Sequence, residues 1–299
     1  MSSLIEIRKK ISSVQNTSKI TKAMQLVASS KMKVFQKKAV HTRAYMHDFL
    51  KILKENLTAD YKSTYTEKRK EGKILFVIYT SDKGLCGSLN NQLIKKLFRS
   101  EKWLNTPEDQ RLLITIGRKS NDFARINKIP VVQHFKGIVE KLTIMQALPI
   151  IDEILKYWND GTAKEVFFAA PHYKNTFVSY PILKQFLPFS EEMIESQFAE
   201  KKDLTVDNVK ETDYMIYEPD KKRVMDVLYW QIVQSSFIES FFELKAAEYS
   251  SRMMAMQSAT DSANKIVNNL KLTYNKTRQQ VITQELAELI GGSAAIQAA

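Results

Sequence analysis

The spacing of apolar side chains divides this chain into two helical ends and a mixed middle. Neither glycine nor proline occurs in residues 1–71 or 220–290, although both punctuate the stretch between them. Each end, if helical throughout, would extend roughly 100 Å at about 1.5 Å per residue, several times the length of an ordinary globular helix. The sequence therefore predicts one very long helix at each end of the chain.

Apolar residues in both ends alternate by three and four positions, as in a coiled coil. In the first end the alternation resumes after residue 14 with a phase shift, which we interpret as a stutter. Its members are Leu4, Ile7, Ile11 and Val14, then Ala28, Met32, Phe35, Ala39, Met46, Phe49 and Leu53; the last end continues with Met253, Met256, Ala263, Val267, Leu270, Tyr274 and Val281. A narrow apolar stripe on a long polar helix needs a partner, so we expect the two ends to pack together.

The middle of the chain has short β-branched runs separated by turn residues and amphipathic stretches, which is typical of α/β structure. The expected strands are 74–80, 112–117, 131–135, 165–170, 177–183 and 214–217. Expected helices are 88–100, 118–127 and 148–158, where Pro149 suits a helix start or a kink. Helices between strands supply the crossovers of a mostly parallel sheet. The predicted domains are a helix at 1–71, an α/β domain at 72–219, and a helix with a short tail at 220–299.

Charge is concentrated in the first helix. The chain has 299 residues, 44% of them hydrophobic, and a formal net charge of +12. Residues 1–71 contain 16 basic and 6 acidic side chains, a net of +10. Such an excess favours an acidic partner, which could be nucleic acid, a phospholipid surface or an acidic protein socket.

The single cysteine, Cys86, excludes an internal disulfide framework and fits a reducing compartment. No apolar run approaches the roughly twenty residues that span a bilayer. The first 22 residues are basic and serine-rich, as in mitochondrial transit peptides. Their apolar spacing continues unbroken into the next forty residues, so we interpret them as part of the first helix.

A loop with two glycines, Gly84 and Gly87, follows the first expected strand and precedes a helix, where a phosphate-binding loop would lie. The glycine spacing of a dinucleotide site and the lysine of a P-loop are both missing. A tight turn is the better interpretation, with Ser88 or Asn90 capping the helix and the glycines supplying positive φ or close packing. We expect Cys86 in this turn to be a buried structural thiol.

Other reactive side chains give no pattern of a site. His41 and His47 are six residues apart, whereas stacked ligands on a helix need three or four. The lysines of the first helix could contact phosphates, but no aromatic residues interleave with them, so a solvated face or an acidic protein sleeve remains open. These lysines are Lys19, Lys22, Lys31, Lys33, Lys37 and Lys38.

Three blocks of the sequence resemble the γ subunit of the F-type ATP synthase, the central shaft of that rotary motor. They are EIRKKISSVQNTSKITKAMQLVASSKM (6–32), SDKGLCGSLN (81–90) and AAEYSSRMMAMQSATDSANKIVNNLKLTYNKTRQQVITQELAELIGG (246–292). The blocks cover under a third of the chain, in the family's order around a variable middle. Ser88, where a second glycine is frequent, and Ser262, where asparagine is common, are small departures.

This resemblance implies an antiparallel coiled coil of the two end helices and a central Rossmann-like α/β domain with a mostly parallel sheet. It implies a central stalk subunit of a proton-translocating ATP synthase, which couples rotation of the c-ring to ATP synthesis or hydrolysis at the β subunits. The implied partners are the α and β subunits of the α3β3 ring, the ε subunit and the membrane c-ring. No catalytic site, cofactor, metal, nucleic acid or direct membrane insertion is implied for this chain.

The resemblance also assigns contact residues. Contacts with β-subunit loops are implied for Arg278, Gln279, Thr283 and Glu285, and contact with the surrounding sleeve for Met24. Tyr217 and Glu218 resemble the turn that faces the c-ring, with Pro219 starting the final helix.

The family motif begins within a few residues of Met1, which leaves no room for a transit peptide. We therefore expect a peripheral protein on the cytoplasmic face of a bacterial plasma membrane, with the matrix side of the mitochondrial inner membrane as the alternative. One thiol cannot form the regulatory cysteine pair of the plastid form. Two other functions stay open: a basic coiled-coil nucleic-acid-binding protein, and a Rossmann-like enzyme with helical oligomerisation arms.

Overall fold

A computed structural model describes residues 4–56, 63–137, 144–189 and 217–297 of the chain. The chain forms two compact units: residues 1–29 with 252–299, called the helical unit here, and residues 30–251, called the globular unit. Both end helices, α1 (Leu4–Asn56) and α7 (Lys221–Gln297), contribute to both units. The predicted domain boundaries after residues 71 and 219 stay a prediction.

The first helix is shorter than the sequence predicted. Helix α1 ends at Asn56, and residues 63–71 form turns and irregular structure. Ser63 holds one of these turns, because its carbonyl accepts from Thr66 N at 3.0 Å and its hydroxyl from Tyr65 N at 3.3 Å. Serine and threonine hydroxyls compete with helical hydrogen bonds in this way. A stretch without glycine or proline was therefore not sufficient to continue the helix.

The predicted stutter in α1 is wrong. The seam alternates by three and four from Leu4 to Leu53 without a phase shift, because Ser18, Thr21 and Gln25 occupy the seam positions between Val14 and Ala28. All three polar residues are half-buried, like Leu4, Ile11 and Val14 before them. Polar residues at seam positions break the apolar pattern but not the periodicity of the helix.

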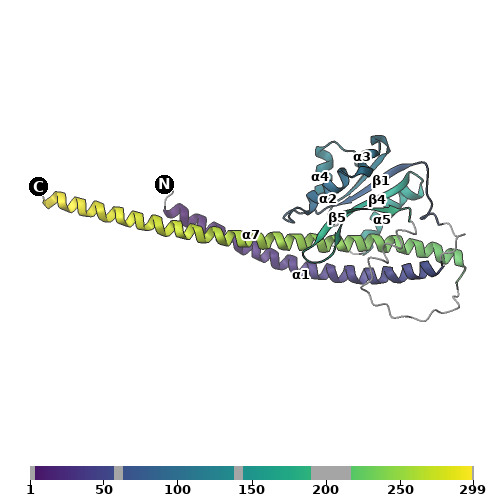
Figure 1. The fold of residues 1–299 in the computed structure, drawn as a ribbon, viewed down its shortest axis with the longest axis horizontal. Coiled ribbons are helices and arrows are strands. Elements are labelled where there is room, and N and C mark those ends of the chain that lie inside the picture. Colours follow the sequence, from purple (N-terminus) through teal and green to yellow (C-terminus); the bar gives the residue numbers. More distant parts are fainter. Residues whose placement is uncertain (1–3, 57–62, 138–143, 190–216, 298–299) are drawn as a thin grey trace. The chain divides into compact units, whose positions relative to one another are not determined.

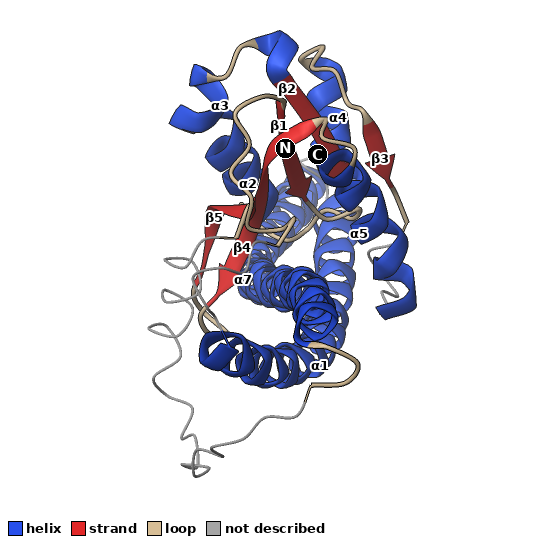
Figure 2. Cartoon of the chain, turned by 90° about the vertical axis from the view of Figure 1, so that its right-hand side faces the viewer, coloured by secondary structure: helices blue, strands red, loops and turns tan. Residues whose placement is uncertain are grey.

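In the helical unit the polar seam residues bond to α7. Ser18 Oγ lies 2.8 Å from Asn264 Oδ1, and the hydroxyls of Thr21 and Thr260 are 2.7 Å apart. Gln25 Nε2 donates to Gln257 Oε1. Because residue numbers rise along α1 as they fall along α7, the two helices are antiparallel, as expected. Figures 1 and 2 show them side by side.

The seam within the globular unit is apolar and more deeply buried. Phe35 stacks on Tyr249 with ring centroids 5.6 Å apart, and also contacts Phe242 at 6.4 Å. The predicted seam residues Met32, Ala39, Met46 and Leu53 are all buried there. Burial of these side chains supplies the hydrophobic stabilisation that the polar layers of the helical unit lack.

The sheet of the globular unit has the strand order β3-β2-β1-β4-β5. Its strands are β1 (Lys73–Tyr79), β2 (Arg111–Ile116), β3 (Gln133–Phe135), β4 (Ala163–Tyr173) and β5 (Ser179–Leu187). All neighbouring pairs are parallel except β4 with β5, so the expected mostly parallel sheet is confirmed. The expected strand at 214–217 lies outside the described residues except for Tyr217, which is not in a strand.

The helices between the strands match the prediction in part. They are α2 (Leu89–Phe98), α3 (Glu101–Asn105), η1 (Glu108–Gln110), α4 (Arg118–Ile126) and α5 (Ile144–Asn159). Helix α3 was not predicted; Ser100 caps it by accepting from Trp103 N at 3.2 Å. Pro149 lies inside α5 and does not start it.

Both faces of the sheet are covered. On one face Phe76, Ile78 and Phe167 pack with residues of α2, α3 and α4, including Trp103, whose ring centroid is 4.9 Å from that of Phe76. On the other face Tyr79 meets Phe241 of α7, with ring centroids 4.7 Å apart. The alternation of side chains along β1 explains this division, since successive residues point to opposite faces. Helix α7 is therefore part of the core of the globular unit.

Candidate functional site

The end of α7 extends beyond the start of α1 in the helical unit. The pairing of Thr21 with Thr260 and of Ser18 with Asn264 places Leu4 opposite the residues around Arg278. Helix α7 continues from there to Gln297, and Figure 1 shows its C-terminal end running past the start of α1. This stretch of α7 has no covering from α1.

Four large apolar side chains are exposed on this uncovered stretch. The exposed fractions are 46% for Ile282, 54% for Leu286, 71% for Leu289 and 67% for Ile290. The sequence analysis missed them, although apolar residues outside the seam phase of a long helix were the available signal. Clustered exposed apolar side chains mark a surface that contacts another protein.

The four residues expected to contact β subunits, Arg278, Gln279, Thr283 and Glu285, lie on the same stretch and are all exposed. Arg278 and Glu285 are seven apart, on the face that carries Ile282. Gln279 and Thr283 are four apart on the neighbouring face, and Thr283 Oγ1 donates to the Gln279 carbonyl at 2.9 Å. At about 100° per residue, these polar residues and the four exposed apolar residues all lie on one broad side of the helix, where polar and apolar side chains are mixed.

Met24 lies on the outer side of α1 in the helical unit. Its side chain is 42% exposed, between Ile20 at 57% and Val27 at 56%. Residues four before and three after a given position share its helix face. Met24 therefore belongs to a second apolar face of α1, distinct from the seam that meets α7.

Tyr217 and Glu218 precede α7. Glu218 is exposed, while Tyr217 is half-buried and its ring centroid lies 5.7 Å from Lys221 Nζ. Pro219 does not start the helix, contrary to the prediction. Asp220 precedes the first helical residue and caps the helix, because its Oδ1 accepts from Arg223 N at 2.9 Å.

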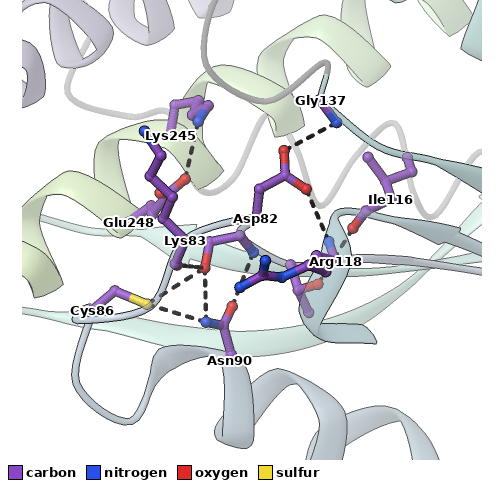
Figure 3. A network of polar contacts seen from close by, with 11 residues as sticks. Asp82, Lys83, Cys86, Asn90, Ile116, Arg118, Gly137, Lys245 and Glu248 are labelled. Carbon is purple, nitrogen blue, oxygen red and sulfur yellow. Dashed lines mark hydrogen bonds and ion pairs between the residues drawn. The ribbon is translucent and has the colours of Figure 1, made fainter. Parts of the chain in front are cut away.

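The turn after β1 is filled by the chain's own carboxylate. Asp82 Oδ1 accepts from Arg118 N at 2.9 Å, and Asp82 Oδ2 accepts from Gly137 N at 3.2 Å (Figure 3). Arg118 N is the first backbone donor of α4, which is the position where a bound phosphate would be held. Asp82 therefore fills the start of α4, whereas the phosphate-binding position expected from the sequence is the start of α2.

Asn90 binds back to the turn rather than capping α2. Its Oδ1 accepts from Ser81 N at 3.0 Å, and its Nδ2 donates to Ser81 Oγ at 2.8 Å and to Cys86 Sγ at 3.1 Å. Ser88 occupies the N-cap position without a side-chain hydrogen bond, so neither predicted cap forms. Cys86 is buried, at 1% exposure, as expected of a structural thiol. Gly87 supplies the expected positive φ, at 58°.

A buried ion pair lies within α7 near this region. Lys245 Nζ lies 3.0 Å from Glu248 Oε2, and both residues are buried (Figure 3). Burial, followed by the nearby carboxylates of Glu248 and Asp82, raises the pKa of Tyr79 well above its ordinary value. Tyr79 is therefore a neutral core residue and not a proton donor at neutral pH.

Among the described residues, no group of His, Cys, Asp and Glu could hold a metal ion. The His134 ring lies 3.0 Å from Thr115 Oγ1, and His172 Nδ1 lies 3.3 Å from Glu243 Oε2. Within the same residues, no helix has the length and hydropathy needed to cross a bilayer.

The chain has a long antiparallel helix pair joined to a mostly parallel α/β sheet, and one end of the helix pair is exposed. These features define a class of protein that works through contact with other chains. The ATP synthase family model matches residues 3–296. The chain therefore belongs to the ATP synthase family, as a γ subunit of its central stalk. The comparisons give no support to a nucleic-acid-binding protein.

Solved structures agree in fold. A chain of the rotor of the Euglena gracilis mitochondrial ATP synthase in rotational state 1 has 18% identity and a TM-score of 0.60, covering 93% of this chain and 98% of that chain. A chain of the OSCP/F1/c-ring structure of the same enzyme in rotational state 3 has 20% identity and a TM-score of 0.67, covering 99% and 95%. A chain of the central stalk and c-ring of the Tetrahymena thermophila mitochondrial enzyme has 23% identity and a TM-score of 0.56, covering 80% and 99%.

Proposed function

We propose that this chain transmits rotation between the membrane c-ring and the catalytic β subunits, with the end of α7 as its contact with the α3β3 ring. The observation that carries the proposal is the uncovered end of α7, where exposed apolar and polar side chains are mixed on one broad side of the helix. Membership of the ATP synthase family supplies the partners. An exposed apolar helix end is stabilised when a surrounding protein surface covers it.

The proposed mechanism is differential contact. A two-helix shaft lacks threefold symmetry, so three surrounding β subunits meet three different faces of it. A partner shifts a conformational equilibrium only by the difference in its affinity for the two states. Rotation exchanges the faces, and each β subunit is biased in turn toward a different affinity for nucleotide.

We assign no catalytic site to this chain and place ATP chemistry on the β subunits. Three features of the globular unit support this. Asp82 fills the anion position at the start of α4, the Cys86 thiol is buried beside Asn90, and Tyr79 is a buried neutral side chain. A nucleophile or a general base needs access to a substrate, which the buried Cys86 and Tyr79 side chains lack.

At the contact surfaces, Arg278, Gln279, Thr283 and Glu285 bind β-subunit loops and Met24 packs against the sleeve. The assignment of Arg278 has the strongest chemical support, because its guanidinium can hold a carboxylate of a β-subunit loop through two hydrogen bonds. Tyr217 and Glu218 face the c-ring at the other end of α7.

The test is Arg278→Ala in the assembled enzyme, with Lys276→Ala as the control because Lys276 is also an exposed basic residue, two positions earlier on α7. Arg278→Ala should leave assembly with α and β subunits intact and lower coupled ATP synthesis in membrane vesicles about tenfold, as expected for a lost charge-assisted contact. Lys276→Ala should synthesise ATP at the original rate. Equal rates for both variants would contradict the assignment.

We also propose that the protein is peripheral on the cytoplasmic face of a bacterial plasma membrane, with the matrix face of the mitochondrial inner membrane as the alternative. The chain should then cofractionate with membranes and be released together with α and β subunits. Release without them would contradict this location.

A further inference from the structure

The end of α7 carries a signal for a helix to stop, and the structure does not follow it. After the exposed Leu289 and Ile290, the sequence continues with Gly291, Gly292 and Ser293. A glycine directly after the last periodic apolar residue is a common way for a helix to end. Helix α7 nevertheless continues through both glycines to its last residue at position 297. Residues 291–297 are therefore helical against their local preference.

The cost of this extension can be placed on a scale. One glycine inside a helix lowers the helix equilibrium about fivefold relative to alanine, and the adjacent pair roughly twentyfold. No basic side chain in the last turn of α7 offsets the free carbonyls of the helix end. The Ser293 hydroxyl donates to the Ile290 carbonyl at 2.9 Å, a bond that also suits a helix ending at Ile290.

The chain's own packing does not compensate this cost. Residues 279–293 lie beyond the start of α1 and are exposed apart from Val281. A Cβ built on Gly291 or Gly292 would meet no atom within 4 Å, so no close approach within the chain requires glycine at either position. Helices in proteins owe most of their stability to tertiary packing. In the chain by itself, residues 291–297 lack that support.

We propose that residues 291–297 are a folding switch: α7 ends at Ile290 in the free chain and extends to Gln297 when the α3β3 ring covers it. The structure describes the extended form. Extension lengthens the helix by about 10 Å, at about 1.5 Å per residue. The identity of the covering partner rests on the rotor function proposed above. Local sequence preference and fold tend to disagree at functional sites, and this disagreement lies on the surface assigned to the ring.

Covering the segment favours the helix for a physical reason. Backbone N–H and C=O groups that lose water need hydrogen-bond partners, and a helix supplies them within the segment. No charged side chain follows Glu288 in the sequence, so covering the segment removes no side-chain charge from water. An enclosing apolar surface therefore favours the extended helix, whereas water favours the stop at Ile290.

The first experiment measures amide hydrogen exchange in the full-length chain alone. Residues 291–297 should exchange at close to the rates of an unstructured peptide, while residues 253–270, which pair with α1, stay protected. Gly291→Ala combined with Gly292→Ala should slow exchange of the segment about tenfold, because alanine removes the stop signal. Gln280→Ala, an exposed change earlier on α7, is the control and should leave this exchange unchanged. Slow exchange of residues 291–297 in the unsubstituted free chain would overturn the proposal.

The second experiment compares the free chain with the assembled enzyme. Exchange of residues 291–297 should slow at least about tenfold on assembly, since the covered backbone cannot open to water. Equal exchange in the two states would overturn the switch.

The third experiment titrates the full-length chain against a mixture of α and β subunits. The double-alanine variant has its helix formed before contact, so its Kd should fall by up to about tenfold, because the cost of ordering the segment is removed. The Gln280→Ala control should bind as the unsubstituted chain does. Unchanged or weaker binding of the double-alanine variant would mean that the glycines serve another purpose, such as clearance for a partner, and would overturn the proposal.

The two proposals fail differently. If the unsubstituted chain does not associate with α and β subunits, the rotor function is wrong and the ring is not the covering partner. Exchange in the free chain still decides whether α7 stops at Ile290. If the chain assembles but residues 291–297 exchange equally in both states, the rotor function stands and only the switch is wrong.

Discussion

At the scale of single residues, Gly117 shows how closely the turn after β2 approaches β1. Its φ is +88°, and a Cβ placed there would lie 2.0 Å from the Thr80 carbonyl oxygen. That oxygen belongs to the backbone and cannot move aside. The approach also brings Gly117 N within 2.9 Å of the Phe135 carbonyl, which joins the turn to β3.

Gly117→Ala should therefore destabilise the chain by more than about 2 kcal/mol, because strained φ and a backbone clash add together. Gly84→Ala is the matched control: no atom lies within 4 Å of its added Cβ, and its φ is not positive. Urea denaturation followed by circular dichroism would measure both. Equal stability of the two variants would show that the turn relaxes more easily than the structure indicates.

At the scale of elements, the two end helices pack along one continuous seam whose side chains differ between the two units. In the globular unit the seam holds Phe35 and Met46 among buried apolar side chains, and in the helical unit paired hydroxyls and amides interrupt the apolar residues. Paired polar groups contribute little net stability, whereas buried apolar groups contribute in proportion to area. The helical unit is therefore the less stable part of the helix pair.

The hydrogen bond between Thr21 and Thr260 can be measured by a double-mutant cycle with Thr21→Val and Thr260→Val. Each hydroxyl lies within reach of a carbonyl of its own helix, and because a hydroxyl has one hydrogen, one of the two donates to its partner while the other donates to its own helix. The single changes should therefore be mild. We expect a coupling energy of about 0.5–1 kcal/mol between the two sites. Thr21→Val combined with Thr273→Val, which is exposed on α7, should be additive. Additivity in both cycles would mean that the hydroxyls do not interact in solution.

At the scale of the whole molecule, the proposed function assigns different partners to the two ends of α7. The start of the helix is capped by Asp220 next to Glu218, and its end is the uncovered stretch that includes Glu285. A helix with one partner at each end can pass rotation between them only if both contacts exist in the same complex.

Crosslinking would test this arrangement in the assembled enzyme. In a Cys86→Ser chain, a crosslinker on Glu218→Cys should reach the c-ring, and one on Glu285→Cys should reach a β subunit. Each product can be identified by mass spectrometry. Crosslinks from position 218 that reach only α or β subunits would remove the assignment of Tyr217 and Glu218.

Local patterns in the sequence were enough to predict the long end helices, five of the strands and the buried state of Cys86. Apolar residues spaced by three and four in a helix, or by two in a strand, show which side of the element is buried. Residues close together in the sequence are enough to establish this pattern. The same patterns placed the end of the first helix at residue 71, although α1 ends at Asn56 and Ser63 forms a turn, and they gave Asn90 the role of a cap.

The tertiary structure alone decided what depends on residues far apart in the chain. The polar seam becomes visible only when Thr21 meets Thr260, and the anion position of α4 is filled only because Asp82 reaches Arg118 N. The uncovered end of α7 follows from the register of two helices that are separated by the whole α/β domain. The periodicity of apolar residues shows which side of an element is buried. Which residues of distant elements pair with each other depends on the folding of the whole chain, and only the tertiary structure determines it.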